Sequence, residues 1–218
     1  MNEVLFLLYT CRRNRERASA CLRTWGKHLQ NLIVITDKEL SLNCKQEIIA
    51  SEGYEKLCEK SLLMWEMAAK KYKHRYRYFI KVDDDTLIFP ERVCKKLMEQ
   101  KWEFFGNAKK YFKSEDQGHP WITGCFYGLS RQGLESLMRA VSKKAGRKKF
   151  ISRGSAEDVS VSVCLAEKGI GASHWDEVLI LDSKKKLKEA ILNKKIVSVN
   201  SLKPWQMKLM SAWMKIQQ

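Results

Sequence analysis

The sequence is poor in proline and contains no long apolar run. Only 3 of its 218 residues are proline, whereas 44% are hydrophobic, and this balance argues for an ordered globular body. No apolar stretch reaches the length of a membrane-spanning helix. The run that starts at Val4 is too short for a secretory signal, and too weakly basic before it. We therefore expect a cytoplasmic protein with no transmembrane segment.

Cysteine and histidine give no disulfide or metal signature. The 7 Cys show no Cys-x-x-Cys spacing, and several, such as Cys21, Cys58 and Cys164, fall among apolar residues at helical spacing. They are expected to be free thiols in the core of a protein from a reducing compartment, with neither a disulfide framework nor a zinc site. The 4 His are scattered, and a histidine on its own is more often structural than catalytic.

Glycine motifs that bind phosphate are missing as well, while positive charge is in excess. The sequence has neither the dinucleotide-binding pattern Gly-x-Gly-x-x-Gly nor a P-loop, which removes most support for a dinucleotide-binding or ATP-hydrolysing protein. There are 41 Lys and Arg against 25 Asp and Glu, so the net charge is +16. Anionic partners are expected, namely nucleotide phosphates, nucleic acid, a membrane surface or an acidic glycan, and charge alone does not choose among them.

A triplet of carboxylates interrupts this basic chain. Asp83, Asp84 and Asp85 follow a β-rich run at residues 78–82 and precede a second apolar run that ends at Pro90. Three acidic side chains at the end of a buried strand repel one another unless a cation or hydrogen-bond donors neutralise them. A hard divalent ion such as Mg²⁺ or Mn²⁺ is the simplest partner, because it prefers carboxylate oxygens. A solvated acidic turn is the alternative interpretation.

The order of the apolar patterns predicts an α/β fold. A strand at residues 4–10, a helix at 17–29 and a strand at 32–36 are joined by the short loops of a right-handed βαβ unit. Further helices are expected at residues 54–73, 90–100, 134–141 and 156–168, and further strands at 102–106 and 121–130. The sequence has no internal repeat and no low-complexity linker, so we expect one domain.

Two parts of the chain have weaker patterns. Residues 143–155 are basic, contain glycine and have no apolar period, so they are expected to form a loop, either a mobile lid or a solvated connector. Beyond Gly171 the periodicity weakens. A strand at 175–181, a basic helix at 184–193 and an edge strand at 196–199 are expected there.

Polar residues follow the first two expected strands at the points where these strands end. Thr10, Arg12 and Arg13 come after the first strand, and Asp37 comes after the second. Open α/β sheets bind their ligands at the carboxyl ends of the strands. These positions are therefore expected to face a ligand.

Three further charged residues lie on expected helices. Glu157 and Asp158 open the helix at 156–168, where acidic residues also have the ordinary role of complementing the helix dipole. Lys60 lies on the helix at 54–73, and a solvated surface lysine is its alternative interpretation. The local pattern alone assigns none of the three a function.

Five short motifs follow one another along most of the chain. They consist of Arg17, Ala20, Cys21, Arg23, Thr24 and Trp25; Tyr54, Leu57, Lys60 and Ser61; Lys81, Asp83, Asp84 and Asp85; Pro120, Gly124, Tyr127 and Ser130; and Glu157, Asp158 and Val159. Each motif alone is weak, but together and in this order they are fairly specific. In this order they resemble the catalytic domain of the fringe and β-1,3-galactosyltransferase group of inverting glycosyltransferases.

The resemblance implies a GT-A fold over residues 1–218, a single domain with a mostly parallel central sheet flanked by helices. It also implies transfer of a sugar from a nucleoside-diphosphate donor, chiefly a UDP-sugar, to a hydroxyl of a glycan or glycoprotein acceptor. The metal, Mn²⁺ or Mg²⁺, is then assigned to Asp83 and Asp85, and the general base is assigned to Asp158. The donor is assigned to Thr10, Arg12, Arg13, Asp37, Lys60 and Asp84.

The implied reaction is a single displacement in which the acceptor oxygen attacks the anomeric carbon from the face opposite the diphosphate. A general base for this step needs a pKa above that of an ordinary carboxylate. Because desolvation raises the pKa of a carboxyl group, we expect Asp158 in a partly apolar pocket, with Trp121 and Phe126 as its walls.

The sequence departs from this family in two respects. The family commonly supplies a histidine metal ligand from its C-terminal segment, whereas residues 197–207 carry Asn200 and no His. Asn200, water or His174 then completes the metal shell, or metal binding is weaker. The signal anchor of the animal members is also missing, which points to a bacterial or viral enzyme, such as the small glycosyltransferase domains of large algal viruses. We expect a monomer with no nucleic-acid partner.

Two functions from other classes remain as alternatives. A metal-dependent phosphoesterase or nuclease also uses clustered carboxylates, but it usually needs a second cluster, for which only Glu157 and Asp158 are available. A nucleic-acid-binding module explains the charge of +16 and leaves the carboxylate triplet unexplained.

Overall fold

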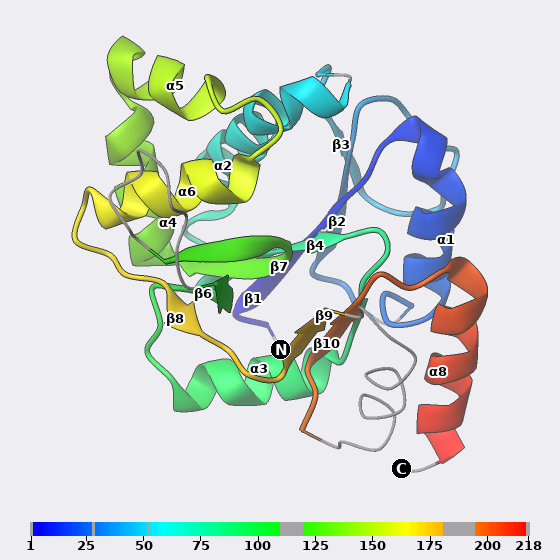
Figure 1. The fold of residues 1–218 in the computed structure, drawn as a ribbon. Coiled ribbons are helices and arrows are strands. Elements are labelled where there is room, and N and C mark those ends of the chain that lie inside the picture. The colour runs from blue at the N-terminus through cyan, green and yellow to red at the C-terminus, as the bar shows by residue number, and fades with distance from the viewer. Residues whose placement is uncertain (1, 28, 52, 110–119, 181–194, 217–218) are drawn as a thin grey trace.

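The computed structural model describes residues 2–27, 29–51, 53–109, 120–180 and 195–216. Within these residues, seven strands form one sheet in the order β3-β2-β1-β4-β7-β6-β8 (Figure 1). These strands are β1 (Val4–Tyr9), β2 (Leu32–Thr36), β3 (Gln46–Ile48), β4 (Tyr78–Asp83), β6 (Phe104–Lys109), β7 (Trp121–Ser130) and β8 (Ser173–His174).

The central sheet is mixed but mostly parallel. Strands β3, β2, β1 and β4 run parallel to one another, β7 is antiparallel to both β4 and β6, and β8 pairs with β6 in parallel. All six residues of β1 are buried, as expected for a strand between two parallel neighbours with both faces covered. The predicted α/β architecture with a large, mostly parallel sheet is confirmed.

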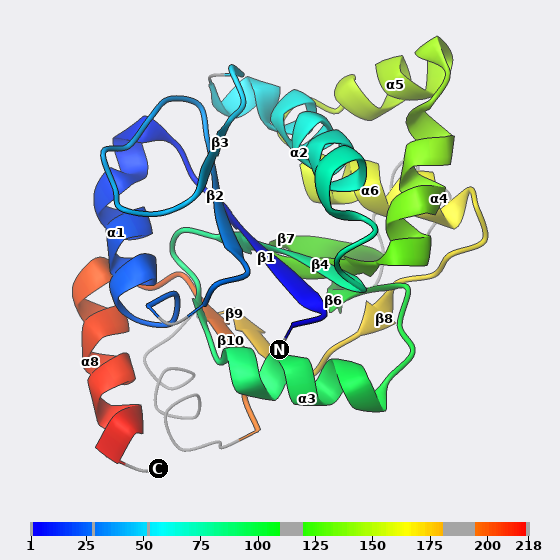
Figure 2. The same cartoon turned by 180° about the vertical axis from the view of Figure 1, so that it is seen from behind.

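Helices cover both faces of this sheet (Figures 1 and 2). Side chains alternate across β1, so that Phe6 and Leu8 belong to one apolar cluster while Leu5 and Leu7 belong to the other. The first cluster lies beneath α1 (Arg15–Arg23), α3 (Pro90–Glu99) and α8 (Pro204–Ile216). The second lies beneath α2 (Leu57–Tyr72), α4 (Arg131–Val141), α5 (Lys144–Ile151) and α6 (Glu157–Ala166).

Local signals in the sequence account for the start of two helices. Pro90 occupies the first turn of α3, where its missing N–H is not needed, and Val93 and Leu97 follow at helical spacing toward the core. At α4, the hydroxyl of Ser130 accepts a hydrogen bond from the N–H of Gly133, which caps the helix. No helix in the described part of the chain has the length and hydropathy to cross a lipid bilayer.

A smaller sheet lies beside the large one and corrects the prediction for residues 196–199. It consists of β5 (Leu87–Ile88), β10 (Ser198–Asn200) and β9 (Val178–Ile180), in the order β5-β10-β9. The prediction of an edge strand is wrong, because β10 lies between an antiparallel and a parallel partner. Its partner β5 is only two residues long, which is too short to show a period in the sequence.

Residues 143–155 also differ from the prediction. They contain the helix α5 instead of a loop, and Phe150 anchors this helix in the cluster beneath α2 and α4. With a single buried residue, the helix shows no apolar period. The basic helix expected at residues 184–193 lies outside the described residues.

Candidate functional site

A cavity of about 580 Å³ opens at the carboxyl ends of the parallel strands. Thr10 and Cys11 line it after β1, Asp37 after β2, and the triplet that begins at Asp83 after β4. The chain leaves β1 for β2 on one side and returns to β4 on the other, so β1 marks the point where the strand order reverses. This is the position at which open α/β sheets bind their ligands.

Asp84 is bound at the floor of this cavity. The hydroxyl of Thr10 donates a hydrogen bond of 2.6 Å to Asp84 Oδ2, and Arg17 Nη1 lies 3.6 Å from Oδ1. Asp84 is buried, and burial raises the pKa of its carboxyl group. Two of the residues expected to meet the donor therefore hold each other in place.

The loop after β1 brings one of its two expected arginines to the cavity. Arg13 is among the lining residues, whereas Arg12 contributes its backbone N–H, which donates a hydrogen bond of 2.7 Å to Asp37 Oδ1. Partial burial acts to raise the pKa of Asp37, but this N–H and further hydrogen bonds outweigh it and lower that pKa. The side chain of Arg12 is exposed and lies outside the described lining of the cavity.

Lys60 is not the solvated surface lysine of the alternative interpretation. It is buried, its ammonium donates a hydrogen bond to the carbonyl oxygen of Thr10, and it lies 4.7 Å from the ring centre of Tyr9. Burial lowers its pKa, although the carboxylate of Asp37 acts in the opposite direction. Lys60 thus holds the start of the loop after β1 by its hydrogen bond to Thr10.

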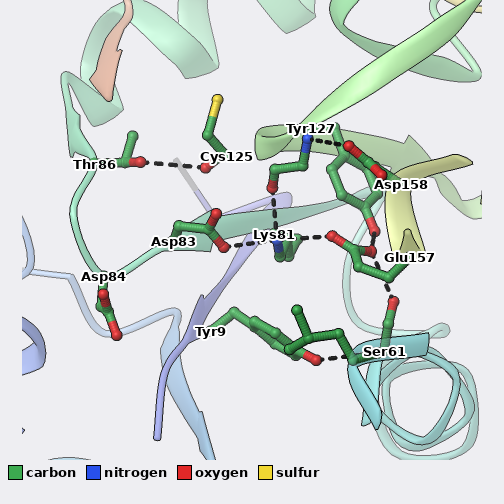
Figure 3. A network of polar contacts seen from close by, with 12 residues as sticks. Tyr9, Ser61, Lys81, Asp83, Asp84, Thr86, Cys125, Tyr127, Glu157 and Asp158 are labelled. Carbon is green, nitrogen blue, oxygen red and sulfur yellow. Dashed lines mark hydrogen bonds and ion pairs between the residues drawn. The ribbon is translucent and has the colours of Figure 1, made fainter. Parts of the chain in front are cut away.

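Lys81, in the middle of β4, is 2% exposed and is bound by three acceptors (Figure 3). Its ammonium lies 2.6 Å from Asp83 Oδ1, 2.6 Å from the carbonyl oxygen of Gly124 and 2.9 Å from Glu157 Oε1. Burial acts to lower the pKa of Lys81, but the carboxylates of Asp83 and Glu157 outweigh it and hold that pKa well above its usual value. Burial raises the pKa of Asp83 to about 7, despite the nearby ammonium.

Glu157 points inward and not into solvent. It is 4% exposed, and besides Lys81 it accepts hydrogen bonds from the hydroxyl of Tyr127, at 2.6 Å, and from that of Ser61, at 3.0 Å. Glu157 does lie in the first turn of α6, where its charge complements the helix dipole, but it is also buried and bound by three side chains. Its carboxylate joins α2, β4, β7 and α6 in one buried polar network (Figure 3).

Asp158 borders the same cavity from the start of α6. Its Oδ2 accepts a hydrogen bond of 2.9 Å from the N–H of Gly124, and its Oδ1 accepts one of 2.9 Å from the N–H of Val159. Burial, and then the charge of Glu157, raise the pKa of Asp158 to about 6. A carboxylate with this pKa is a stronger base than an ordinary aspartate.

The expected aromatic walls beside Asp158 are not found. Neither Trp121 nor Phe126 is among the described residues that line the cavity. Phe126 is fully buried on the other face of β7, where its ring centre lies 5.7 Å from that of Trp175. Gly124 and Cys125 line the cavity beside Asp158 instead.

The smaller sheet brings Asn200 to the carboxylate triplet. Asn200 Nδ2 donates hydrogen bonds of 2.7 Å to Asp85 Oδ1 and 2.9 Å to Thr86 Oγ1. His174 lies on β8, where its Nδ1 accepts a hydrogen bond from the N–H of Ala108, and it is outside the described lining of the cavity. Of the two side chains considered for the metal shell, Asn200 is the one beside Asp85.

The donor chemistry of Asp83 and Asp85 fits a hard divalent cation. Both side chains line the cavity, and the contacts to Lys81 and Asn200 use Oδ1 of each. No group of three or more His, Cys, Asp and Glu side chains in the described ranges is arranged to hold a metal ion. Mg²⁺ and Mn²⁺ are commonly bound by one or two carboxylates, with substrate phosphates and water as the other ligands.

Sequence reasoning missed the buried network around Lys81. Ser61, Lys81 and Tyr127 entered only as parts of motifs. The available signal was the charge itself, because residues 78–82 otherwise form an apolar run in a central strand. A lysine in such a strand must find partners, since an unpaired buried charge is strongly destabilising.

Comparison with known families connects this site with sugar transfer. The family model described as galactosyltransferase matches residues 47–113. The matched segment carries Lys60 and the triplet that begins at Asp83, but neither the loop after β1 nor α6. The match supports a galactosyltransferase-like family for this chain, and with it the function of a glycosyltransferase.

Proposed function

We propose that the protein is a metal-dependent inverting glycosyltransferase whose residues 1–218 form one GT-A-like domain. It moves a sugar from a UDP-sugar to a hydroxyl of a glycan or glycoprotein. The observation that carries this proposal is that a single cavity is lined both by the triplet of Asp83, Asp84 and Asp85 and by Asp158. The first group suits a diphosphate with its cation, and Asp158 suits an acceptor hydroxyl.

The donor is placed across the carboxyl ends of β1, β2 and β4. Arg13 is free to meet the negative charge of the diphosphate, because it lines the cavity and is exposed. Thr10 and Asp84 are engaged with each other, so they shape the floor under the donor, and Asp37 and Arg13 line the cavity beside them.

Asp83 and Asp85 are the residues that would hold Mn²⁺ or Mg²⁺. Such an ion, when bound, acts as a Lewis acid on the diphosphate oxygens. Asn200 holds the carboxylate of Asp85 by a hydrogen bond, and Lys81 holds that of Asp83. These contacts orient both carboxylates before any ligand arrives.

Asp158 is the general base in this proposal. It takes the proton of the acceptor hydroxyl while the hydroxyl oxygen forms a bond to the anomeric carbon. The bond from that carbon to the diphosphate breaks on the opposite face, so the configuration inverts. Glu157 cannot replace Asp158, because it is 4% exposed and its carboxylate is paired with the ammonium of Lys81.

The geometry disfavours the phosphoesterase alternative. That reaction usually requires a second carboxylate cluster for a second metal ion. Glu157, one of the two carboxylates available for it, is bound to Lys81 and is 4% exposed. Of these two carboxylates, only Asp158 is left to bind a second metal ion.

Nucleotide-sugar binding and product release test the proposal together. The protein is mixed with UDP-, GDP- and dTDP-sugars and Mn²⁺, and its melting temperature is recorded. Release of nucleoside diphosphate is then followed with a panel of glycan and glycoprotein acceptors, with Asp158→Asn as the control. We expect stabilisation by a UDP-sugar in both proteins and acceptor-dependent release in the parent alone. Stabilisation by none of the nucleotide sugars, or cleavage of a phosphodiester instead, contradicts the proposal.

A further inference from the structure

The ammonium of Lys81 has no donor left for a ligand. A lysine ammonium carries three N–H groups, and Lys81 has three acceptors within 2.9 Å, namely Asp83 Oδ1, the Gly124 carbonyl oxygen and Glu157 Oε1. Lys81 borders the cavity, but all three of its N–H groups point to acceptors inside the protein. Its role is to connect Asp83 of its own strand with groups that β7 and α6 supply (Figure 3).

Gly124 carries this connection on to Asp158. Its carbonyl oxygen accepts from Lys81, and its N–H donates to Asp158 Oδ2 at 2.9 Å, so one residue of β7 lies between the two side chains. The fit is close: a Cβ added to Gly124 would lie 2.9 Å from Glu157 Oε1 and 3.4 Å from Asp158 Oδ2. A side chain at this position would displace the carboxylates of α6.

The other end of the connection is Asp83, at the end of the same strand as Lys81. β4 is a rigid base for it, because β4 lies between β1 and β7, with Lys81 opposite Leu7 on one side and Tyr127 on the other. A continuous path thus leads from Asp83 through Lys81 and Gly124 to Asp158.

An inverting displacement is sensitive to the distance between the ends of this path. The acceptor oxygen, the anomeric carbon and the leaving oxygen must be nearly in line, and a misplacement of about 1 Å can slow such a step about 10²-fold. In the proposed function Asp83 serves the diphosphate and Asp158 the acceptor, so the separation of these two residues sets how well both substrates can be aligned.

We propose that Lys81 is a positioning residue that sets the separation between Asp83 and Asp158, and that it acts through Gly124. The inference rests on the proposed function, since it gives Asp83 and Asp158 their roles. Lys81 touches neither substrate and exchanges no proton in this account.

The backbone amide of Gly124 is a direct probe of the path. Because its N–H donates to Asp158, its NMR signal follows the protonation of that carboxylate, with a midpoint at a pH of about 6. In Lys81→Met we expect this titration to disappear and transfer to fall about 10²-fold. UDP affinity without added metal should stay within a few-fold of the parent, because Arg13 and Asp37 are unchanged.

Two further variants keep the inference testable if Lys81→Met does not fold. Gly124→Ala acts at the next step of the path, between Lys81 and Asp158, and leaves the charge of Lys81 in place, so it should reproduce the loss of transfer. Tyr127→Phe is the matched control in the same network, because it removes a hydrogen bond to Glu157 and leaves the path through Gly124 intact. It should keep the Gly124 titration and transfer within a few-fold of the parent.

The outcomes separate this inference from the proposed function. A parent protein that transfers no sugar to any acceptor defeats the proposed function, and the titration of Gly124, which needs neither metal nor substrate, still tests the path. The inference is overturned if Lys81→Met loses transfer while its Gly124 amide titrates as in the parent. Full transfer in Lys81→Met or in Gly124→Ala also overturns it.

Discussion

The hydroxyl of Thr10 donates a hydrogen bond of 2.6 Å to Asp84 Oδ2 and so joins the ends of β1 and β4, two neighbouring strands. The two residues are 74 positions apart in the sequence. Both are buried at the point where the strand order reverses. The floor of the cavity is therefore fixed by the protein itself before a ligand binds.

This contact predicts a stability effect for Thr10→Val. The variant keeps the shape of the side chain but leaves a buried acceptor of Asp84 without its donor, so the free energy of unfolding should fall by about 1–3 kcal/mol. Urea unfolding measures it. Thr123→Val is the matched control, since its hydroxyl donates to the neutral carbonyl of Asn107 at 3.2 Å, and it should lose less. Equal losses in both variants would show that the charge of Asp84 is irrelevant.

Asp85→Ala should abolish Mn²⁺-dependent transfer while the fold is retained. The variant removes one carboxylate of the proposed metal pair and one of three adjacent negative charges, and the hydrogen bond from Asn200 to Thr86 remains. Calorimetry with Mn²⁺ and a transfer assay with and without EDTA check the expectation. Full activity of Asp85→Ala in EDTA would exclude the proposed metal site.

Asp83→Ala should reduce transfer less than Asp85→Ala but reduce stability more. Asp83 is one of two carboxylates that neutralise the buried Lys81, and removing one partner of a buried ion pair destabilises the folded state. The melting temperatures of the two variants without metal give the comparison. A higher melting temperature for Asp83→Ala than for Asp85→Ala contradicts it.

Arg13→Ala should weaken binding of both the UDP-sugar and free UDP, because the lost contact is to the diphosphate that they share. Arg12→Ala is the control. Both arginines were expected at the donor, but Arg12 contributes only its backbone N–H, which donates to Asp37. This N–H is still present in Arg12→Ala. Calorimetry on both ligands measures the effect. An equal loss in both variants, or none in Arg13→Ala, would place the diphosphate elsewhere.

Asp158→Asn should reduce transfer by about 10²–10⁴-fold, because an amide cannot accept the proton of the acceptor. The change also removes one hydrogen bond, since both carboxylate oxygens of Asp158 accept from backbone N–H groups. A melting curve measures that structural part separately, and donor affinity should change little. Glu157→Gln should act mainly on stability, because it removes a charge opposite Lys81. A near-normal rate in Asp158→Asn would exclude this base.

The pH profile of transfer should have an acidic limb with a midpoint at a pH of about 6. Only the ionised carboxylate of Asp158 accepts a proton, and burial and Glu157 raise its pKa, so activity is present above that pKa and is lost as the pH falls through it. Of the charged groups that act on Asp158, Glu157 raises this pKa and Lys81 lowers it. Initial rates at saturating Mn²⁺ give the profile. Constant rates between about pH 5 and 7 would contradict this assignment.

Much of the central sheet could be predicted because its strands are buried on both faces. Residues 4–10 and 32–36 read as continuous apolar runs, and the structure places β1 and β2 there. The prediction of a loop at residues 143–155 was wrong for the opposite reason. The helix α5 buries only Phe150, so its sequence shows no apolar period. The prediction that β10 is an edge strand was wrong because its neighbour β5 has only two residues, too few to be recognised in the sequence.

The sequence could predict where the candidate residues that follow strands lie, but it could not predict the contacts inside the protein. The ends of parallel strands meet at one edge of a sheet, so Thr10, Asp37 and the triplet could be brought together from sequence. Lys81 and Glu157 are 76 positions apart, and no local pattern pairs them. An acidic residue in a first helical turn also has an ordinary explanation, which hid the buried role of Glu157.

The pairing of Lys81 with Gly124 and Glu157 has a consequence for how the protein is made. As the chain leaves the ribosome from its N-terminus, β4 is complete well before residues 124 and 157 emerge. Until then the ammonium of Lys81 lacks two of its three acceptors, and water must solvate it. Domains generally fold as units during synthesis, so a nascent chain that ends before residue 157 should fail to bury the central strand stably. A fragment limited to residues 47–113 should fail for the same reason, because it holds β4 without β1, β7 or α6.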